Sequence, residues 1–341
     1  MKEFLQKLFD GTSFEKGEMK TAVDLLLEDG TTDSEVASFL TALKMKGETV
    51  KEISALVELL RERANFQPFP SSDVMDICGT GGDGSQSFNI STTTAFVLAG
   101  AGVKVAKHGN RSVSSKTGSS DVLEHLGITL DFNSLEIHEM LESNGLAFLY
   151  APYVHTRLKK IMKVRGELKI PTIFNMIGPL TNPVQIDTQL LGIYRRDMLG
   201  KMASVLHELG RKRAVVLNGA GFMDEASLAG ENHLVLLAEG NITEFTITPD
   251  ETGLPVYPNE EIRGGDAIEN AEILLRILKG KEGAHLDTVL FNAGIALFAN
   301  GKTTTIAEGV KLARESIESG AALEKLQRTV SYSQHVRRKV M

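Results

Sequence analysis

The chain has 341 residues, of which 42% are hydrophobic and 24% are charged, and its formal net charge at pH 7 is −7. An acidic chain lacks the positive field of a general nucleic-acid binder, so we expect no nucleic-acid partner. The single cysteine excludes an internal disulfide, and no apolar run approaches the ~18 residues that a membrane-spanning helix needs. The N-terminus, MKEFLQKLFD, lacks the apolar region of a signal peptide, so we expect a globular protein of the cytoplasm.

Residues 1–65 show helical patterns. Thr32 and Thr49 each begin a capping box, in which the threonine hydroxyl accepts from the third helical amide while a glutamate reaches back. The apolar stripe of the helix after Thr49 consists of Ile53, Leu56, Val57 and Leu60. Pro68 and Pro70 prevent the helix from continuing, so we predict a small all-α domain over residues 1–70.

From residue 74 onward, short apolar runs alternate with helical patterns. This alternation is typical of a parallel sheet with helices on its faces. The predicted strands are 74–78, 103–107, 146–150, 189–194, 213–218, 233–238 and 242–248. We therefore expect a multi-domain α/β fold in which residues 71–164 and 189–341 form a large domain with a mostly parallel central sheet.

The region 154–185 interrupts the alternation of strands and helices. Residues 154–164 predict a helix that ends at a turn formed by Arg165 and Gly166, and residues 171–178 predict a short helix stopped by Pro179. We expect part of the segment near 165–188 to pack against the N-terminal helices and to join the small domain.

Two loops rich in glycine and hydroxyl groups follow the first two predicted strands. The first begins Gly79-Thr80-Gly81-Gly82 and leads into a helix after Asn89, and the second occupies residues 107–117. Glycine amides and the unpaired amides at a helix N-terminus bind phosphate oxygens. Two such loops side by side on one sheet predict a site for a ligand that carries more than one phosphate.

Five motifs in chain order are similar to those of the anthranilate phosphoribosyltransferase family. They are Gly79-Thr80-Gly81-Gly82-Asp83, Asn89-Ile90-Ser91-Thr92, Lys107-His108-Gly109-Asn110-Arg111-Ser112-Val113-Ser114-Ser115, Ile177-Gly178-Pro179-Leu180-Thr181-Asn182-Pro183 and Asp224-Glu225. The resemblance implies transfer of the 5-phosphoribosyl group of phosphoribosyl diphosphate (PRPP) to the amine of anthranilate, in tryptophan biosynthesis. It also implies Mg²⁺ as cofactor and a homodimer formed through the helical domain.

The resemblance assigns site residues as well. For PRPP it implies Gly79, Gly82, Asp83, Ser87, Asn89, Ile90, Ser91, Thr92, Lys107, His108, Gly109, Asn110, Arg111, Ser112, Val113, Ser114, Ser115 and Ser119. For anthranilate it implies Gly79, Asn110, Arg165, Gly178 and Pro179, with the Arg165 guanidinium pairing with the carboxylate, and for Mg²⁺ it implies Ser91, Asp224 and Glu225. Lys107 and Arg165 would act electrostatically, and no residue is assigned as a catalytic acid or base.

Several alternatives stay open at this point. A pyrimidine nucleoside phosphorylase would share the fold, but its Lys-His-Ser-Thr-Gly-Gly phosphate loop is absent from the sequence. The net negative charge of the chain and the presence of all five motifs argue against a non-catalytic nucleic-acid-binding relative. His108 could be structural or an acid/base group, and Arg165 could form a surface ion pair with Glu167 or Asp187. Ala229-Gly230-Glu231 departs from the Thr-Gly-Pro that the resemblance leads us to expect.

Overall fold

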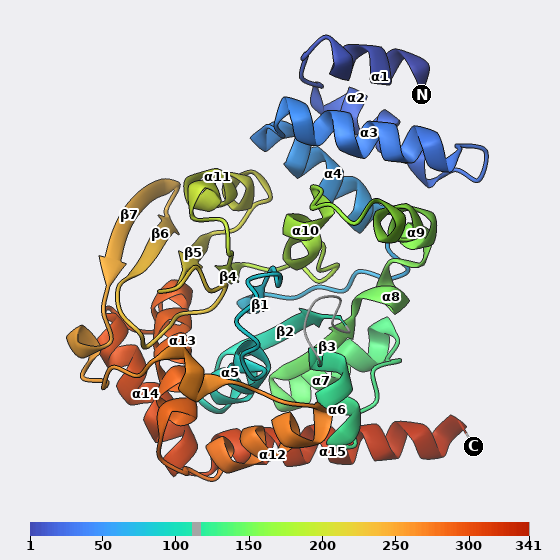
Figure 1. The fold of residues 1–341 in the computed structure, drawn as a ribbon. Helices are drawn as coiled ribbons and strands as arrows, with labels where there is room; N and C mark the ends of the chain where they lie inside the picture. Colours follow the sequence, from blue (N-terminus) through green and yellow to red (C-terminus); the bar gives the residue numbers. More distant parts are fainter. Residues whose placement is uncertain (111–116, 341) are drawn as a thin grey trace.

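The structure is a computed structural model that describes residues 1–110 and 117–340. Four helices open the chain: α1 (Lys2–Phe9), α2 (Lys16–Leu27), α3 (Asp33–Lys46) and α4 (Val50–Glu62). Both predicted capping boxes are present, since Thr32 and Thr49 each accept a hydrogen bond of 3.2 Å from the glutamate amide three residues on. The predicted apolar stripe of α4 is buried. These helices form a separate layer at the top of Figure 1.

The remaining chain is built on one seven-stranded sheet with the order β3-β2-β1-β4-β5-β6-β7. The strands are β1 (Val74–Gly79), β2 (Lys104–Gly109), β3 (Leu146–Tyr150), β4 (Thr188–Gly192), β5 (Arg213–Asn218), β6 (Asn232–Ala238) and β7 (Asn241–Ile247). The strands from β3 to β5 are parallel, whereas β6 and β7 join as an antiparallel edge. The predicted α/β fold with a mostly parallel sheet is confirmed.

Helices cover both faces of the sheet. The longer helices that cover the sheet or pack on those that do are α5 (Ile90–Gly100), α6 (Ser119–His125), α7 (Ser134–Asn144), α11 (Leu199–Glu208), α12 (Ala267–Leu278), α13 (Ala284–Asn300), α14 (Ile306–Glu318) and α15 (Ala321–Val340). Short 3-10 helices lie at Arg196–Met198, Asp250–Thr252 and Asn259–Ile262. In the part of the chain that the structure describes, none of the helices has the length and apolar character to cross a bilayer.

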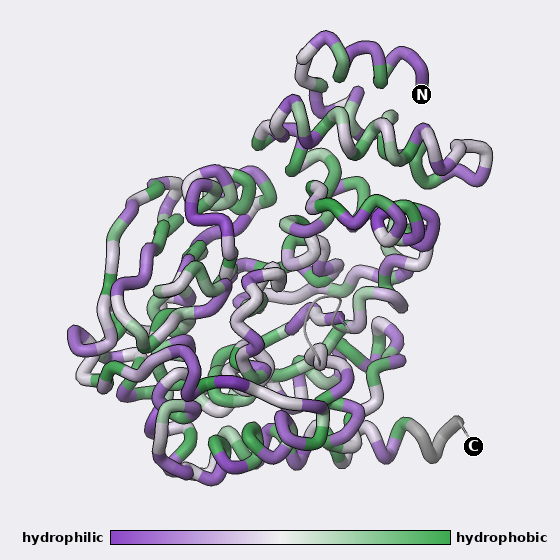
Figure 2. The backbone as a smooth tube through the Cα atoms, viewed as in Figure 1, coloured by the Kyte–Doolittle hydropathy of each residue, from purple (hydrophilic) through white to green (hydrophobic). Residues whose placement is uncertain are grey.

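Alternate residues of the strands belong to two hydrophobic cores. In β5, Val215 and Leu217 pack with α5 and α13, whereas Ala214 and Val216 pack with α11 in a cluster that also includes α2 to α4. Figure 2 shows hydrophobic segments along the central strands and hydrophilic ones at the periphery. The second core therefore joins the N-terminal helices to the sheet.

The predicted helix over residues 154–164, ending in a turn at Arg165 and Gly166, is wrong in its boundaries. The chain forms α8 (Ala151–Val154), a 3-10 helix (Thr156–Leu158) and then α9 (Lys159–Leu168), which contains both Arg165 and Gly166. A glycine inside a helix costs only about 1 kcal/mol, and tertiary contacts outweigh that cost. The helix ends instead at Leu168, and Lys169, which follows it, has a left-handed φ of 51°.

The polar contacts that hold α9 come from the connection between α2 and α3 and from the start of α3. Lys160 Nζ donates to the carbonyl oxygens of Glu28, Asp29 and Thr31 at 3.0, 2.9 and 2.6 Å, and Lys163 Nζ lies 2.6 Å from Asp33 Oδ2. These contacts begin before the segment 165–188 that we expected to make them. The predicted helix at 171–178 is shorter, α10 (Phe174–Ile177), and a 3-10 helix (Gly178–Leu180) continues through Pro179, because proline is tolerated in a first turn.

Candidate active site

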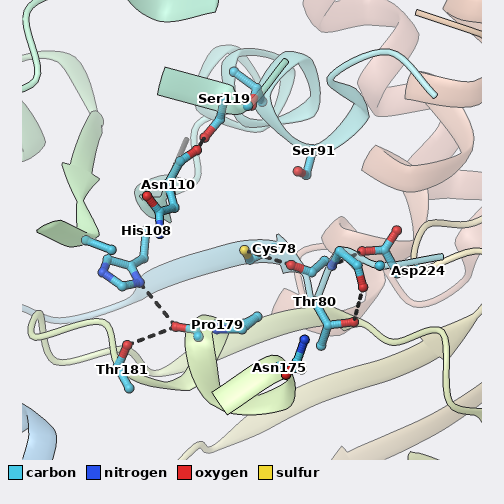
Figure 3. A pocket seen from close by; sticks show the side chains of 18 of the residues that line it. Cys78, Thr80, Ser91, His108, Asn110, Ser119, Asn175, Pro179, Thr181 and Asp224 are labelled. Carbon is cyan, nitrogen blue, oxygen red and sulfur yellow. Dashed lines mark hydrogen bonds between the residues drawn. The ribbon is translucent and has the colours of Figure 1, made fainter. Parts of the chain in front are cut away.

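A cavity of about 740 Å³ opens at the carboxyl ends of the parallel strands, between the sheet and the segment that contains α9 and α10. Every described residue that the sequence assigned to the site lines this cavity. The assignments of Arg111, Ser112, Val113, Ser114 and Ser115 fall outside the described residues. Figure 3 shows Asp224 at one end of the cavity and His108 at the other, with Ser91 and Ser119 facing Asn175 and Pro179.

The glycine loop after β1 and the residue before α5 both border the cavity. Gly81 and Gly82 have φ values of 71° and 83°, which favour glycine and let the backbone turn toward the cavity. Asn89, just before α5, has a buried Oδ1 without a hydrogen-bond partner among the described residues. A buried acceptor without a partner is costly, so this atom is suited to a ligand hydroxyl.

Lys107 and Asp76 are two buried ionisable residues next to the loops that follow β1 and β2. Lys107 is 2% exposed, and its Nζ donates to the carbonyl oxygen of Ile77 at 2.8 Å. Asp76 accepts from Asn182 Nδ2 at 3.0 Å and from the His108 amide at 3.3 Å. Burial raises the pKa of Asp76, while the charge of Lys107 opposes that rise. These contacts tie the end of β2 to β1 at the point where the second loop begins.

Asp224 and Glu225 lie buried on the connection between β5 and β6. Asp224 Oδ2 accepts from the Gly81 amide at 2.6 Å, and the Asp224 amide donates to Asp83 Oδ2 at 3.3 Å. Burial raises the pKa of Asp224, and the charges of Asp83 and Glu225 raise it further. Burial also raises the pKa of Glu225 to about 7, against the lowering effects of Lys107 and of a hydrogen bond from Ser91. Mutually repelling carboxylates in one buried place favour a bound cation.

The donor set fits Mg²⁺ bound together with a phosphate ligand. No cluster of three or more His, Cys, Asp or Glu side chains that could hold a metal occurs within residues 1–110 and 117–340. Mg²⁺ is commonly bound by one or two carboxylates and retains waters and substrate phosphate oxygens. Asp224, Glu225 and the Ser91 hydroxyl are such an incomplete set.

Glycines let the acidic pair approach the sheet. A Cβ atom on Gly192, the last residue of β4, would lie 1.6 Å from the Asp224 carbonyl oxygen, and one on Gly79 would lie 2.2 Å from Asp224 Oδ2. Gly192→Ala should therefore lower the free energy of unfolding by at least ~3 kcal/mol, the upper end for overpacking. Urea denaturation measures this, with Gly200→Ala as control, since its Cβ would meet only Glu244 Oε1, at 3.5 Å. Equal stability of the two variants would contradict the close approach.

Two buried histidines occupy the opposite end of the cavity. His108 Nδ1 lies 3.3 Å from the Gly178 carbonyl oxygen, His155 Nε2 lies 2.9 Å from that of Thr181, and the ring centroids are 5.6 Å apart. Burial lowers the pKa of His108 to about 3 and that of His155 to about 4, so both rings are neutral at pH 7. His108 Nε2 has no hydrogen-bond partner among the described residues.

This burial predicts acid sensitivity. Both folded-state pKa values lie below the ordinary 6.5, so below pH 6.5 the unfolded chain binds more protons and stability falls as the pH falls. Each histidine contributes a slope of up to about 1.4 kcal/mol per pH unit between pH 6 and pH 4. In urea denaturation at several pH values, His108→Gln should flatten the slope and the exposed control His125→Gln should not. An unchanged slope in His108→Gln would refute this.

Arg165, on α9, also lines the cavity. One of its terminal nitrogens donates to Asn175 Oδ1 at 3.2 Å, and its Cζ lies 5.6 Å from the Phe174 ring centroid. Its buried Nε has no partner in the part of the chain that is described. The alternative partners Glu167 and Asp187 lie instead near Lys163, at 3.8 Å, and Lys212, at 2.7 Å. A guanidinium fork with a free donor is suited to a ligand carboxylate.

Residues 71–323 match the Glycosyl transferase family, a/b domain, and residues 2–64 match the Glycosyl transferase family, helical bundle domain. Anthranilate phosphoribosyltransferase of Exiguobacterium sibiricum is 62% identical over 96% of each chain, and that of Bacillus cereus strain B4264 is 57% identical over 98% of each. The chain belongs to the anthranilate phosphoribosyltransferase family. The family resemblance predicted from the five motifs is thus confirmed.

Solved members of the anthranilate phosphoribosyltransferase family share the whole fold. The Thermus thermophilus enzyme aligns with a TM-score of 0.92 and 39% identity, covering 97% of this chain and 99% of that one. The Saccharomyces cerevisiae enzyme in complex with PRPP and Mg aligns with a TM-score of 0.88 and 26% identity, covering 98% of this chain and 97% of that one.

Some residues that line the cavity of this chain were not predicted from the sequence. His155, Asn175 and Phe174 line the cavity. They belong to the region 154–185, where the sequence indicated helices but no binding motif at these three positions. The unexpected Ala229-Gly230-Glu231 sequence is accommodated by Asn232, whose Nδ2 donates to the Gly230 carbonyl oxygen at 2.8 Å.

Proposed function

We propose that the chain transfers the 5-phosphoribosyl group of PRPP to the amine of anthranilate, giving N-(5-phosphoribosyl)anthranilate and diphosphate in tryptophan biosynthesis. The observation that carries this proposal is one cavity with two chemically distinct ends. A glycine loop and buried carboxylates line one part of it, and another part is lined by the Arg165 guanidinium, whose Nε has no hydrogen-bond partner among the described residues. Membership of the anthranilate phosphoribosyltransferase family supports the same reaction.

PRPP would lie along the two loops that follow β1 and β2. Amides of the glycine loop and of the first turn of α5 would face its phosphates, and Asn89 Oδ1 would accept from a ribose hydroxyl. Lys107 would supply positive charge beside the diphosphate. The predicted contacts from Arg111 to Ser115 belong to the same proposal, although they lie outside the described residues.

Ser91, Asp224 and Glu225 would hold Mg²⁺ next to the diphosphate. When bound there, the ion would neutralise charge that develops on the leaving group. The short contact between Gly81 and Asp224 would keep the carboxylates aligned with the glycine loop.

Anthranilate would bind at the other end of the cavity, with its carboxylate on Arg165 and its ring against Gly178 and Pro179. Gly79 and Asn110 would lie between the two substrates. The aryl amine is neutral at pH 7 and needs no strong base before it attacks, so the residues of this end would act by aligning it with the anomeric carbon. The neutral imidazoles of His108 and His155 would add no competing charge.

An assay of anthranilate fluorescence tests the proposal. With PRPP and Mg²⁺ present the fluorescence should fall, and one diphosphate should appear for each anthranilate consumed. A pyrimidine nucleoside with inorganic phosphate should give no reaction. Phosphorolysis of the nucleoside without consumption of anthranilate would favour the phosphorylase alternative instead.

We also propose a homodimer that forms through the helical domain, in the cytoplasm. The N-terminal helices expose large apolar side chains, with Phe9 65% and Met45 84% exposed, and a second copy would cover such surface. The helical domain would comprise residues 1–70 and part of 165–188, and the α/β domain residues 71–164 and 189–341. Light scattering of the purified protein distinguishes a monomer from a dimer.

A further inference from the structure

The connection between β5 and β6, residues 219–231, is held by three asparagines that have no exposed surface. Asn218 ends β5, Asn232 begins β6, and Asn292 belongs to α13. In Figure 1, α13 lies against the sheet below β4 and β5. None of the three lines the cavity, whereas Asp224 and Glu225 on the same connection do.

Asn292 contacts both main-chain groups of a single residue. Its Oδ1 accepts from the Ala226 amide at 2.9 Å, and its Nδ2 donates to the Ala226 carbonyl oxygen at 2.9 Å. The same Nδ2 donates to the Thr288 carbonyl oxygen one turn earlier in α13, also at 2.9 Å. Ala226 directly follows Glu225, so this bidentate contact fixes the backbone adjoining the acidic pair.

The other two asparagines secure the chain on either side. Asn218 Nδ2 donates to the Met223 carbonyl oxygen at 3.3 Å, just before Asp224. Asn232 Oδ1 accepts from the Ser227 amide at 2.7 Å, and its Nδ2 donates to the Ser227 carbonyl oxygen at 2.9 Å. The backbone is therefore fixed by buried side-chain amides before and after the acidic pair, while the carboxylates themselves face the cavity.

We propose that Asn292 is a positioning residue for the metal site, which it serves by holding Ala226 and thereby setting the carboxylates of Asp224 and Glu225. This inference rests on the proposed role of that pair in binding Mg²⁺. Irregular buried backbone has no strand or helix to satisfy its polar groups, so a side chain must do so. Supporting contacts of this kind determine how well metal ligands are aligned.

The test measures metal dependence rather than turnover. PRPP is titrated by calorimetry into the full-length protein at a series of MgCl₂ concentrations, which gives the Mg²⁺ concentration for half-maximal PRPP binding. Asn292→Ala should raise this concentration about 10-fold, the lower end for loss of a ligand's supporting contact. Asn292→Asp preserves the side-chain volume and one acceptor but loses both donors, so it should also raise the Mg²⁺ concentration for half-maximal PRPP binding. This second variant tests the inference even if Asn292→Ala folds poorly.

The matched control is Asn144→Ala. Asn144 is also buried, and its Nδ2 donates to the Lys325 carbonyl oxygen at 3.1 Å and to Thr329 Oγ1 at 2.9 Å, between α7 and α15. The control should lose stability without a change in metal dependence.

An unchanged Mg²⁺ requirement in both Asn292 variants, or an equal rise in Asn144→Ala, would overturn the inference. If Asp224→Asn with Glu225→Gln shifts the requirement and the Asn292 variants do not, only this inference fails. If the carboxylate variant does not shift it, the metal assignment itself fails.

Discussion

Replacing Asp224 by Asn together with Glu225 by Gln should raise the Mg²⁺ concentration for half-maximal activity more than about 100-fold. Loss of a supporting contact alone costs about 10- to 100-fold in metal affinity, and this double substitution removes the charged ligands themselves. The shapes of both side chains are preserved, so the packing against Gly79 and Gly192 should survive. Initial rates measured across a MgCl₂ series, at saturating PRPP and anthranilate, give the result.

The matched control for this prediction is another adjacent acidic pair. Glu260 and Glu261 are both exposed, and replacing both by Gln removes the same number of charges. The control should leave the Mg²⁺ requirement unchanged. If the Asp224 and Glu225 variant gave the same Mg²⁺ curve as the control, these carboxylates could not be the metal ligands.

Arg165→Ala should raise the KM for anthranilate roughly 10- to 150-fold, because hydrogen bonds to charged groups contribute about 1.5–3 kcal/mol. The KM for PRPP should change little. Arg165→Lys should not restore binding, since an ammonium group cannot reproduce the planar fork of a guanidinium. Steady-state kinetics with each substrate varied in turn measure both constants.

Arg157→Ala serves as the control for Arg165. Arg157 is exposed, lies in the segment just before α9 and does not line the cavity. It should leave both KM values near those of the unaltered protein. Equal rises in the two KM values for Arg165→Ala would mean that the residue supports the cavity as a whole rather than the acceptor carboxylate.

The sheet and the two loops that follow β1 and β2 could be predicted from the sequence because their signals are local. Most of the strands are short apolar runs bounded by turn residues, and Thr32 and Thr49 mark helix starts that the structure reproduces. The glycine loop and the loop after β2 each follow a strand directly. Since parallel strands end at the same edge of a sheet, their meeting could be expected without coordinates.

The second half of the site depended on tertiary contacts that no local pattern encodes. Lys160 and Lys163 of α9 contact Thr31 and Asp33 in the N-terminal part of the chain. These tertiary contacts stabilise α9, which therefore continues through Arg165, where the sequence predicted a turn. His155 and Asn175 enter the cavity only because the insert folds back over the sheet. Asn292 is separated from Ala226 by 66 residues, and nothing in its neighbourhood in the sequence indicates that it holds the acidic pair.

The most direct test of the two-ended cavity compares the Asp224→Asn, Glu225→Gln variant with Arg165→Ala in one assay. For each protein the KM for PRPP, the KM for anthranilate and the Mg²⁺ requirement are determined from the fall in anthranilate fluorescence. We expect opposite patterns, with the carboxylate variant altered in Mg²⁺ and PRPP dependence and Arg165→Ala altered in anthranilate dependence. If both variants changed all three quantities in the same proportion, the assignment of donor and acceptor to opposite ends of the cavity would be wrong.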